Sequence, residues 1–395
     1  MYRASGLTWW RFRNGLQFVH LWAGLILAIP FVIIGITGSL IVAQDWYAEL
    51  SAPPATTVGP MQPLANIVAA GQKAAPPGWP VNAVSMPSRG GIAAAVQIGL
   101  PPGRRPPGGR NLQGLTIYID PVSLKVLGSE ERRRQGEFNR NLRSMHIALM
   151  VPKYYGVQIV GFLGIGLVLF ALSGLVLWWP RKGQWRSAFW VRSGARGFRL
   201  NRDLHAVTGF WSLLVFLIVC ISGVDLAFPV TFQSAVGDIL PLKTDLTNVS
   251  VDAQTAAAVA NKNALTPDDA AHVALASVAN ARIVQVQLPP RPDGVYMVTL
   301  VPHLVADTAP QISTFIGPGP EMLDVVDPRN YSAGKQMLVW LRVLHYGQGL
   351  GYIWRALVFM SGLLPLVFAI TGVSMWWLKR AQRREIPDAL PQPAE

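Results

Sequence analysis

The chain of 395 residues is poor in charge and almost free of cysteine. Only 14% of its residues are charged, while 51% are apolar. This balance is typical of membrane helices joined by polar segments, not of a soluble globular protein. The one cysteine, Cys220, excludes an intramolecular disulfide, a Cys-based zinc site and a Cys-ligated iron–sulfur cluster. No Cys-x-x-Cys-His motif occurs either, which excludes covalently attached c-type haem.

Four mostly apolar runs are long enough to cross a bilayer, for which a helix needs about 20 such residues. They lie at residues 16–44, 157–180, 204–227 and 353–378. The first run is too long for the apolar part of a cleaved signal peptide, and no small-residue cleavage site ends it. We therefore expect it to be retained as a membrane anchor.

The net charge of +13 is concentrated beside the apolar runs, which argues against a nucleic-acid partner. The short link at residues 181–203 carries Arg181, Lys182, Arg186, Arg192, Arg196, Arg199 and Arg202. Because basic loops stay inside, this link and the termini at residues 1–15 and 379–395 are predicted to be cytoplasmic. The long segments at residues 45–140 and 228–340 then lie in the periplasm, and the chain is a multi-pass protein of a bacterial inner membrane.

The sequence contains an internal repeat. Leu142–His146 (LRSMH) matches Leu341–His345 (LRVLH), and Ser173–Trp179 (SGLVLWW) matches Thr371–Trp377 (TGVSMWW). The spacing from His20 to Gly38 equals that from His205 to Gly223. The apolar runs therefore form two parallel repeats, and we expect an all-α bundle of four membrane helices related by a pseudo-two-fold axis along the membrane normal.

Four of the six histidines occupy equivalent places in the repeats. His20 and His205 fall near the cytoplasmic ends of the first and third helices. His146 and His345 precede the second and fourth helices, on short interface helices at residues 141–156 and 341–352, where proline and glycine can break the chain. The symmetry predicts one histidine pair near each membrane face, and two facing imidazoles suit the axial positions of a b-type haem. We therefore predict two b haems, with these histidines as the iron ligands, and electron transfer as their chemistry.

Arginine lies three residues before three of these histidines, at Arg202, Arg143 and Arg342, on the same helix face, where it can pair with a haem propionate. Three alternatives stay open: a purely structural hydrogen-bonding role for the histidines, a metal site, or a proton path. Arg202 is also explained as ordinary topology-setting charge. Asp225 is interpreted as a cap, with solvent contact or a proton path as the alternative, and His272 and His303 as surface residues.

Each long segment resembles a small α+β module. A helix is expected from Pro267 to about residue 279, with Thr266 as its N-cap. Strands are expected at residues 81–86, 92–98, 116–120, 283–288 and 295–301, with Gly/Pro-rich turns at 101–109 and 317–320. Both segments carry an Asp-Pro ending, Asp120-Pro121 and Asp327-Pro328. Neither segment has a nucleophile–base pair, a zinc spacing or a phosphate loop, so binding or gating is the expected role.

With these motifs the chain resembles the PepSY-associated transmembrane helix family, found among bacterial iron-uptake genes. The resemblance is carried by the His-xxx-Gly helices at His20 and His205, the Leu-Arg-xx-His motifs, the Trp-Trp helix ends and the PepSY-like extracytoplasmic segments. Its layout is similar to that of the ferrisiderophore reductases of that family. The resemblance implies two haems held by membrane histidines, and reduction of periplasmic Fe(III) chelates with release of Fe(II).

The function predicted on this basis is a haem-dependent ferric-chelate (ferrisiderophore) reductase of the inner membrane. Its electrons would come from a cytoplasmic reductant or a membrane quinol, and its other partners are membrane lipid and the chelate. No flavin or nicotinamide fingerprint names the donor. Two alternatives remain: a respiratory-type cytochrome b that delivers electrons to a partner protein, and a haem-free PepSY membrane regulator or sensor.

Overall fold

The computed structural model describes residues 2–87, 91–101, 112–133, 137–181, 183–242, 265–291, 294–319 and 321–384. Most of the predicted turn at 101–109, Lys182, residue 320 of the predicted 317–320 turn and the tail after residue 384 lie outside these ranges.

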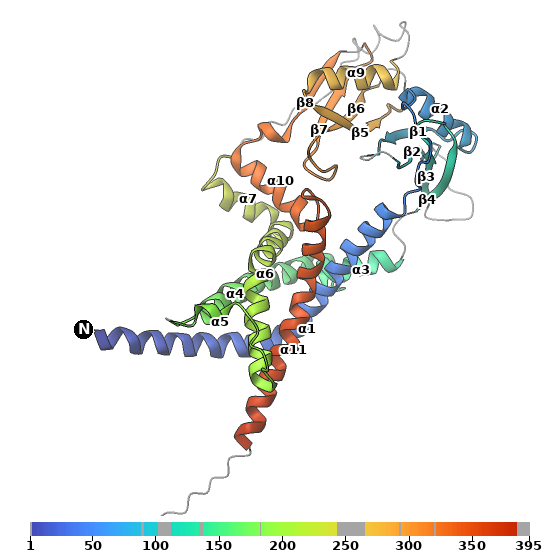
Figure 1. Ribbon diagram of the computed structural model, residues 1–395. Helices are drawn as coiled ribbons and strands as arrows, with labels where there is room; N and C mark the ends of the chain where they lie inside the picture. The colour runs from blue at the N-terminus through green and yellow to red at the C-terminus, as the bar shows by residue number, and fades with distance from the viewer. Residues whose placement is uncertain are drawn as a thin grey trace, which may run out of the picture.

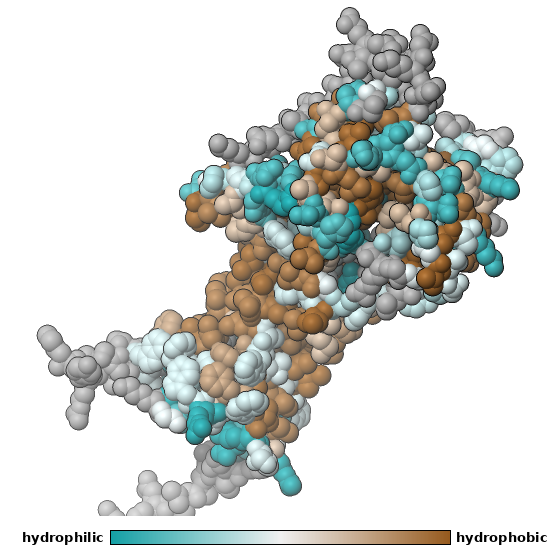
Figure 2. Space-filling view, turned by 45° about the horizontal axis from the view of Figure 1, so that its top comes forward, coloured by the Kyte–Doolittle hydropathy of each residue, from teal (hydrophilic) through white to brown (hydrophobic). Residues whose placement is uncertain are grey.

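Four helices are long and apolar enough to cross a membrane, judged by length and composition over the described residues. They are α1 (Tyr2–Leu50), α4 (Lys153–Trp178), α6 (Gly197–Ala227) and α11 (Gly351–Arg384). Hydrophobic residues dominate the surface over the middle of the molecule, and hydrophilic residues gather towards its two ends (Figure 2). The prediction of four membrane helices is therefore confirmed.

The four long helices pack so that α1 contacts α11 and α4, while α6 contacts the same two helices. In this arrangement α1 and α6 lie across the bundle from each other. Backbones come close where α1 crosses α11, because a side chain on Gly35 would collide with the carbonyl of Gly362. Ser39 Oγ donates to the carbonyl of Phe359 at 2.7 Å beside this crossing. Small residues at a crossing are the usual way for membrane helices to pack closely.

A short helix precedes each of α4 and α11 on the side of the bundle that carries the sheet (Figure 1). These are α3 (Glu137–Ala148) and α10 (Ala333–His345). After α3 the backbone turns through Leu149 and Met150 at positive φ, and Pro152 then caps α4. After α10 the turn uses glycines at positive φ (70°, 90° and 79°): Gly347, Gly349 and Gly351. The chain therefore breaks where proline and glycine predicted it, and both short helices start and end earlier than expected.

The two long segments outside the bundle join in one antiparallel sheet of eight strands, with the order β4-β3-β2-β1-β5-β6-β7-β8. The first segment supplies β1 (Val81–Ser85), β2 (Ala94–Gly99), β3 (Leu112–Ile119) and β4 (Val126–Arg133). The second supplies β5 (Ala281–Gln287), β6 (Tyr296–Pro302), β7 (Ile312–Ile316) and β8 (Met322–Val326). Pairing of β1 with β5 places Val84 opposite Val286 and links the two segments. The sequence predicted two modules, and in the structure they share one sheet and one core.

Two helices, α2 (Leu64–Ala74) and α9 (Pro267–Ser277), contribute to this core together with one face of the sheet. Thr266 is the N-cap of α9, as predicted, and it forms a capping box with Asp269. The carboxylate of Asp268 accepts hydrogen bonds from the backbone N–H groups of Leu64 (2.7 Å) and Ala65 (2.8 Å). Asp268, from the second long segment, therefore caps α2 of the first long segment.

The Asp-Pro endings are not equivalent in the structure. Asp120 lies between β3 and β4, whereas Asp327 follows β8. Each carboxylate accepts hydrogen bonds from backbone N–H groups two or three residues further along the chain. Such a turn is suited to the end of any strand. Strand β4 escaped prediction because its Ser-Glu-Glu-Arg-Arg end has the composition of a charged loop.

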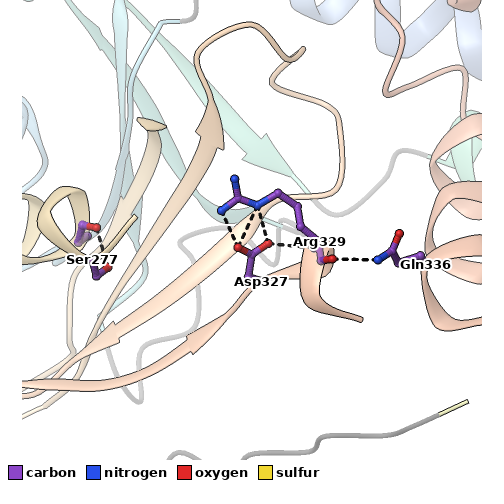
Figure 3. A network of polar contacts seen from close by, with 5 residues as sticks. Ser277, Asp327, Arg329 and Gln336 are labelled. Atoms are coloured by element: carbon purple, nitrogen blue, oxygen red, sulfur yellow. Dashed lines mark hydrogen bonds and ion pairs between the residues drawn. The ribbon is translucent and has the colours of Figure 1, made fainter. Parts of the chain in front are cut away.

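The sheet connects to α10 through the short turn Pro328–Asn330. Arg329 holds Asp327 through Nε (2.9 Å) and Nη2 (2.6 Å), and Gln336 of α10 donates to the carbonyl of Arg329 at 2.9 Å (Figure 3). Burial acts to raise the pKa of Asp327, but the bonds from Arg329 outweigh it and hold that pKa below its ordinary value. A second connection is the bond from the Gly349 N–H to Thr308 Oγ1 in the β6–β7 loop, at 3.1 Å.

We expect Asp268→Ala to loosen the junction between the two segments. It leaves the first N–H groups of α2 without their acceptor, a loss of about 1–2 kcal/mol by analogy with helix caps. Hydrogen exchange of the full chain should become faster in α2 and in β1. Asp238→Ala, which removes an exposed acid outside the sheet, serves as the control. Unchanged exchange in α2 would contradict the assigned role.

A second prediction concerns Asp120, which is 1% exposed. The N–H groups of Ser123, Val122 and Thr57, with the Thr57 hydroxyl, hold the pKa of this carboxyl well below its ordinary value of 3.8. The folded state thus binds this proton less well than the unfolded state, so the stabilisation is complete above the unfolded pKa and is lost as pH falls through the folded pKa. Asp120→Asn should lower the melting temperature at pH 7, by an amount that shrinks below about pH 4. Glu137→Gln, at an exposed site, should show no such trend.

Candidate functional site

The bundle brings together two of the predicted histidines near the link between α4 and α6. His20 of α1 and His205 of α6 face each other with ring centroids 6.4 Å apart and ring planes at 73°. Each ring packs against a phenylalanine of a neighbouring helix, Phe170 for His20 and Phe368 for His205, both at 5.0 Å. We call these two histidines the link-side pair.

The other two predicted histidines meet on the side of the sheet. His146 of α3 and His345 of α10 have ring centroids 6.3 Å apart and ring planes at 45°. They sit at the ends of short helices whose following turns carry the chain into α4 and α11. We call these histidines the sheet-side pair.

Hydrogen bonds fix the protonation of the sheet-side rings. His146 Nδ1 lies 2.9 Å from the carbonyl of Ile34, and His345 Nδ1 lies 3.0 Å from the carbonyl of Val219. A carbonyl only accepts, so each Nδ1 must carry the proton and donate. In the neutral imidazole this leaves the lone pair on Nε2.

In the link-side pair, hydroxyl groups place the ring proton on Nδ1 in the same way. His20 Nδ1 lies 2.8 Å from Ser173 Oγ, and His205 Nδ1 lies 2.8 Å from Thr371 Oγ1. Ser173 donates its own proton to the carbonyl of Phe170, and Thr371 donates to that of Val367. Each hydroxyl oxygen therefore accepts from Nδ1–H, and Nε2 again carries the lone pair. Ser173 and Thr371 are matching positions in the predicted repeats.

Two rings at this separation can share one metal ion. An imidazole nitrogen binds a first-row metal at about 2.0–2.1 Å, and the ring centre lies about 1.1 Å behind it, so two rings in line have centres roughly 6.3 Å apart. Histidines that bind metals usually donate their other ring N–H to a carbonyl or similar acceptor, as all four do here. No described residue forms a hydrogen bond with Nε2 of either pair. The residues present thus fit bis-histidine ligation of haem iron, with each pair offering two nitrogens.

Glycine makes room for the sheet-side rings. A Cβ added to Gly38 of α1 would lie 2.8 Å from Cε1 of His146, and one added to Gly223 of α6 would lie 3.3 Å from Cε1 of His345. The first distance is too short for any side chain to stay without movement of the ring. Glycine is needed at Gly38 because the imidazole packs directly on the helix backbone.

The two pairs lie at different depths of the bundle. Seventeen residues separate His20 from Thr37, which contacts His146, and the same number separates His205 from Ser222, which contacts His345. This spacing corresponds to about 25 Å of helix rise. This distance is most of the thickness of a bilayer core, which is about 30 Å.

The three predicted arginines are all exposed, and two of them have acidic neighbours. Arg202 lies 3.6 Å from Asp203, and Arg342 lies 3.6 Å from Asp225. Arg143 lies one helical turn before His146. Contact with a haem propionate stays a prediction for all three arginines.

Two further charged residues lie near the sheet-side pair. The interpretation of Asp225 as a cap is wrong, because its carboxylate is fully buried and makes no hydrogen bond to a backbone N–H of the described chain. Arg355, which sequence reasoning missed, is 6% exposed, and its Nε lies 3.4 Å from the carbonyl of Gly347. The sequence feature that could have indicated this residue is a single arginine within the apolar start of α11. His272 and His303 are exposed, as predicted.

These features define a multi-pass membrane protein with a sheet domain on one side of its helices. A family model described as the PepSY-associated TM region matches residues 17–379, and the chain belongs to this family. The sequence matches no curated protein. The described residues hold no group of three or more His, Cys, Asp or Glu side chains able to bind a metal ion by themselves.

Proposed function

We propose that this protein is a two-haem oxidoreductase of the bacterial inner membrane that reduces Fe(III) chelates, such as ferrisiderophores, in the periplasm. In this proposal its bundle consists of two parallel repeats, its sheet domain is built of two PepSY modules, and its termini and basic link are cytoplasmic. The observation that carries the proposal is the state of the four imidazoles. Each donates Nδ1–H to an oxygen and keeps Nε2 for a ligand, in pairs spaced for one iron.

The histidines have named roles in this proposal. His20 and His205 would hold the haem near the cytoplasm, and His146 and His345 the haem near the periplasm. When bound, the two b haems supply one-electron chemistry at two depths of the membrane. Ser173, Thr371 and the carbonyls of Ile34 and Val219 orient the imidazoles by accepting their Nδ1 protons.

The arginines are proposed as partners of the haem propionates. Arg143 and Arg342 each precede a sheet-side histidine by one helical turn, and Arg202 precedes His205 in the same way. Their exposure leaves the guanidinium groups accessible to an anionic group at the edge of the bundle. The ion pair of Arg342 with the buried Asp225 holds that guanidinium at the sheet-side level.

The substrate side is proposed to be the space between the sheet and the sheet-side pair. The bond from Gly349 to Thr308 joins the sheet directly to the turn that follows His345. One electron converts chelated Fe(III) to Fe(II), which hard oxygen ligands hold far less tightly, so the iron is released. A cytoplasmic reductant or a membrane quinol would supply the electron.

The test is the haem content of the purified full chain. Wild-type protein should show a b-type reduced-minus-oxidised spectrum with about two haems per chain. His20→Ala and His345→Ala should each lose about one of them, and ferric-chelate reduction in vesicles should fall with either. His272→Ala and His303→Ala, at exposed histidines, are matched controls that should keep both haems.

Each failure of this experiment has a distinct meaning. A colourless wild-type protein overturns the haem proposal and favours a membrane regulator. Full haem content with no reduction of ferric chelates, but with reduction of a partner protein, overturns only the substrate and favours a respiratory-type cytochrome. Retention of both haems in His345→Ala would remove the sheet-side pair as a ligand set.

A further prediction follows from the contact between Gly38 and His146. Gly38→Ala should displace the imidazole and lower the haem content or alter the spectrum of the sheet-side site, because the added methyl would lie 2.8 Å from Cε1. Gly223→Ala, with 3.3 Å to its histidine, should have a smaller effect. Gly15→Ala meets no heavy atom within 4 Å and is the control. An unchanged spectrum in a folded Gly38→Ala protein would contradict the tight fit.

A further inference from the structure

The basic link and the start of α6 lie at the end of the bundle away from the sheet (Figure 1). They border an open hollow of about 490 Å³. It is lined by Arg192, Ser193, Gly194, Ala195, Arg196 and Arg199. Three of these six residues are arginines, so the hollow is strongly basic.

Only part of this charge is compensated within the protein. Arg192 is held by the buried Asp203 through Nε (2.8 Å) and Nη2 (2.6 Å). The guanidinium groups of Arg196 and Arg199 form no hydrogen bond or ion pair with the rest of the described chain. Residues 181–203 carry seven basic side chains and one acidic one, Asp203. Two arginines of the hollow therefore remain available for an anion, and Arg192 is fixed in place beside them.

The backbone adds to this preference for an anion. Gly194 and Gly197 have φ of +75° and +55°, and no heavy atom lies within 4 Å of the place where either would carry a Cβ. The N-cap residue of α6, Arg196, makes no side-chain hydrogen bond to the first helical turn. The open N–H groups and the positive end of the helix dipole therefore border the same hollow as the arginines.

The surroundings of the hollow have the aromatic residues that are typical of a membrane surface. The link packs on the bundle through aromatic rings, with Trp178 stacked on Phe210 at 4.2 Å and Phe189 beside Phe210 at 4.9 Å. Trp190 and Trp211 are 69% and 62% exposed. Exposed tryptophans beside apolar helices are typical of the interface between lipid and water.

The distance of the arginines from the apolar run of α6 also agrees with a position at the membrane surface. The apolar run of α6 starts at Leu204, and Arg199 lies five residues before it, about 7.5 Å of helix rise. This distance is close to the thickness of one headgroup layer, about 5–7 Å.

We propose that this hollow binds the phosphate group of an anionic phospholipid, held by Arg196 and Arg199 and bordered by Arg192 and the start of α6. The same phosphoester chemistry could come from a soluble phosphate compound, but the exposed tryptophans favour a ligand with acyl chains. The bound headgroup would tie the link and α6, which carries His205, to one leaflet. The site is independent of the haem proposal.

The test compares two double variants of the full chain in detergent micelles. Arg196→Gln/Arg199→Gln removes the free charges of the hollow, and Arg181→Gln/Arg186→Gln removes the same charge from the same link outside the hollow. Binding of phosphatidylglycerol, phosphatidylcholine and glycerol phosphate is measured by native mass spectrometry. A melting curve of each variant checks that it is folded.

The wild-type protein and the second variant should both retain phosphatidylglycerol in preference to phosphatidylcholine. Arg196→Gln/Arg199→Gln should bind it on the order of tenfold less well. Equal binding by both variants, or no preference for the anionic lipid in the wild type, would overturn the proposal. Glycerol phosphate binding as tightly as the lipid would overturn the lipid as the source of the phosphate.

Discussion

The four half-buried imidazoles of the bundle impose the constraint on which the rest of the membrane part depends. A ring N–H inside an apolar bundle must be paired, because an unpaired polar group costs a few kcal/mol there. Each Nδ1 finds its acceptor on another helix: α1 with α4, α6 with α11, α3 with α1, and α10 with α6. Each of these hydrogen bonds joins two helices of the same predicted repeat. The contact between the two rings of a pair, in contrast, joins one repeat to the other. The same side chains therefore hold each half together and bring the two halves face to face.

The sheet joins the two halves a third time, outside the bundle. Pairing of β1 with β5 and the cap that Asp268 gives to α2 connect residues about 200 positions apart. Because the sheet is also tied to α10 by Gln336 and to the turn after His345 by Thr308, a shift of the sheet would reach the sheet-side pair. A binding event on the sheet thus has a short physical connection to these histidines, through one helix and one turn.

Sequence reasoning succeeded where local pattern decides the outcome. Hydropathy predicted the four membrane helices, Thr266 as N-cap followed by Pro267 predicted the start of α9, and proline and glycine predicted the breaks before α4 and α11. The repeat indicated which histidines would meet, although their ligand remains a prediction. Other features depend on tertiary contacts that no local pattern encodes. The β1–β5 pairing joins distant segments, β4 is an edge strand with the composition of a loop, and Arg355 is buried in contact with the turn at Gly347.

Asp225 marks a place where the two predicted repeats differ in chemistry. It lies twenty residues after His205, and the residue twenty positions after His20 is Leu40. Asp225 is fully buried beside Arg342, whereas Leu40 is 44% exposed on a helix face without a matching acid. The contact of 3.6 Å with Asp225 constrains Arg342 in a way that Arg143 is not constrained. The two sides of the sheet-side pair are therefore electrostatically unequal, even though their histidines are held alike. An anionic group approaching that pair would meet an exposed guanidinium with no ion pair to the described chain on one side, and one paired with Asp225 on the other.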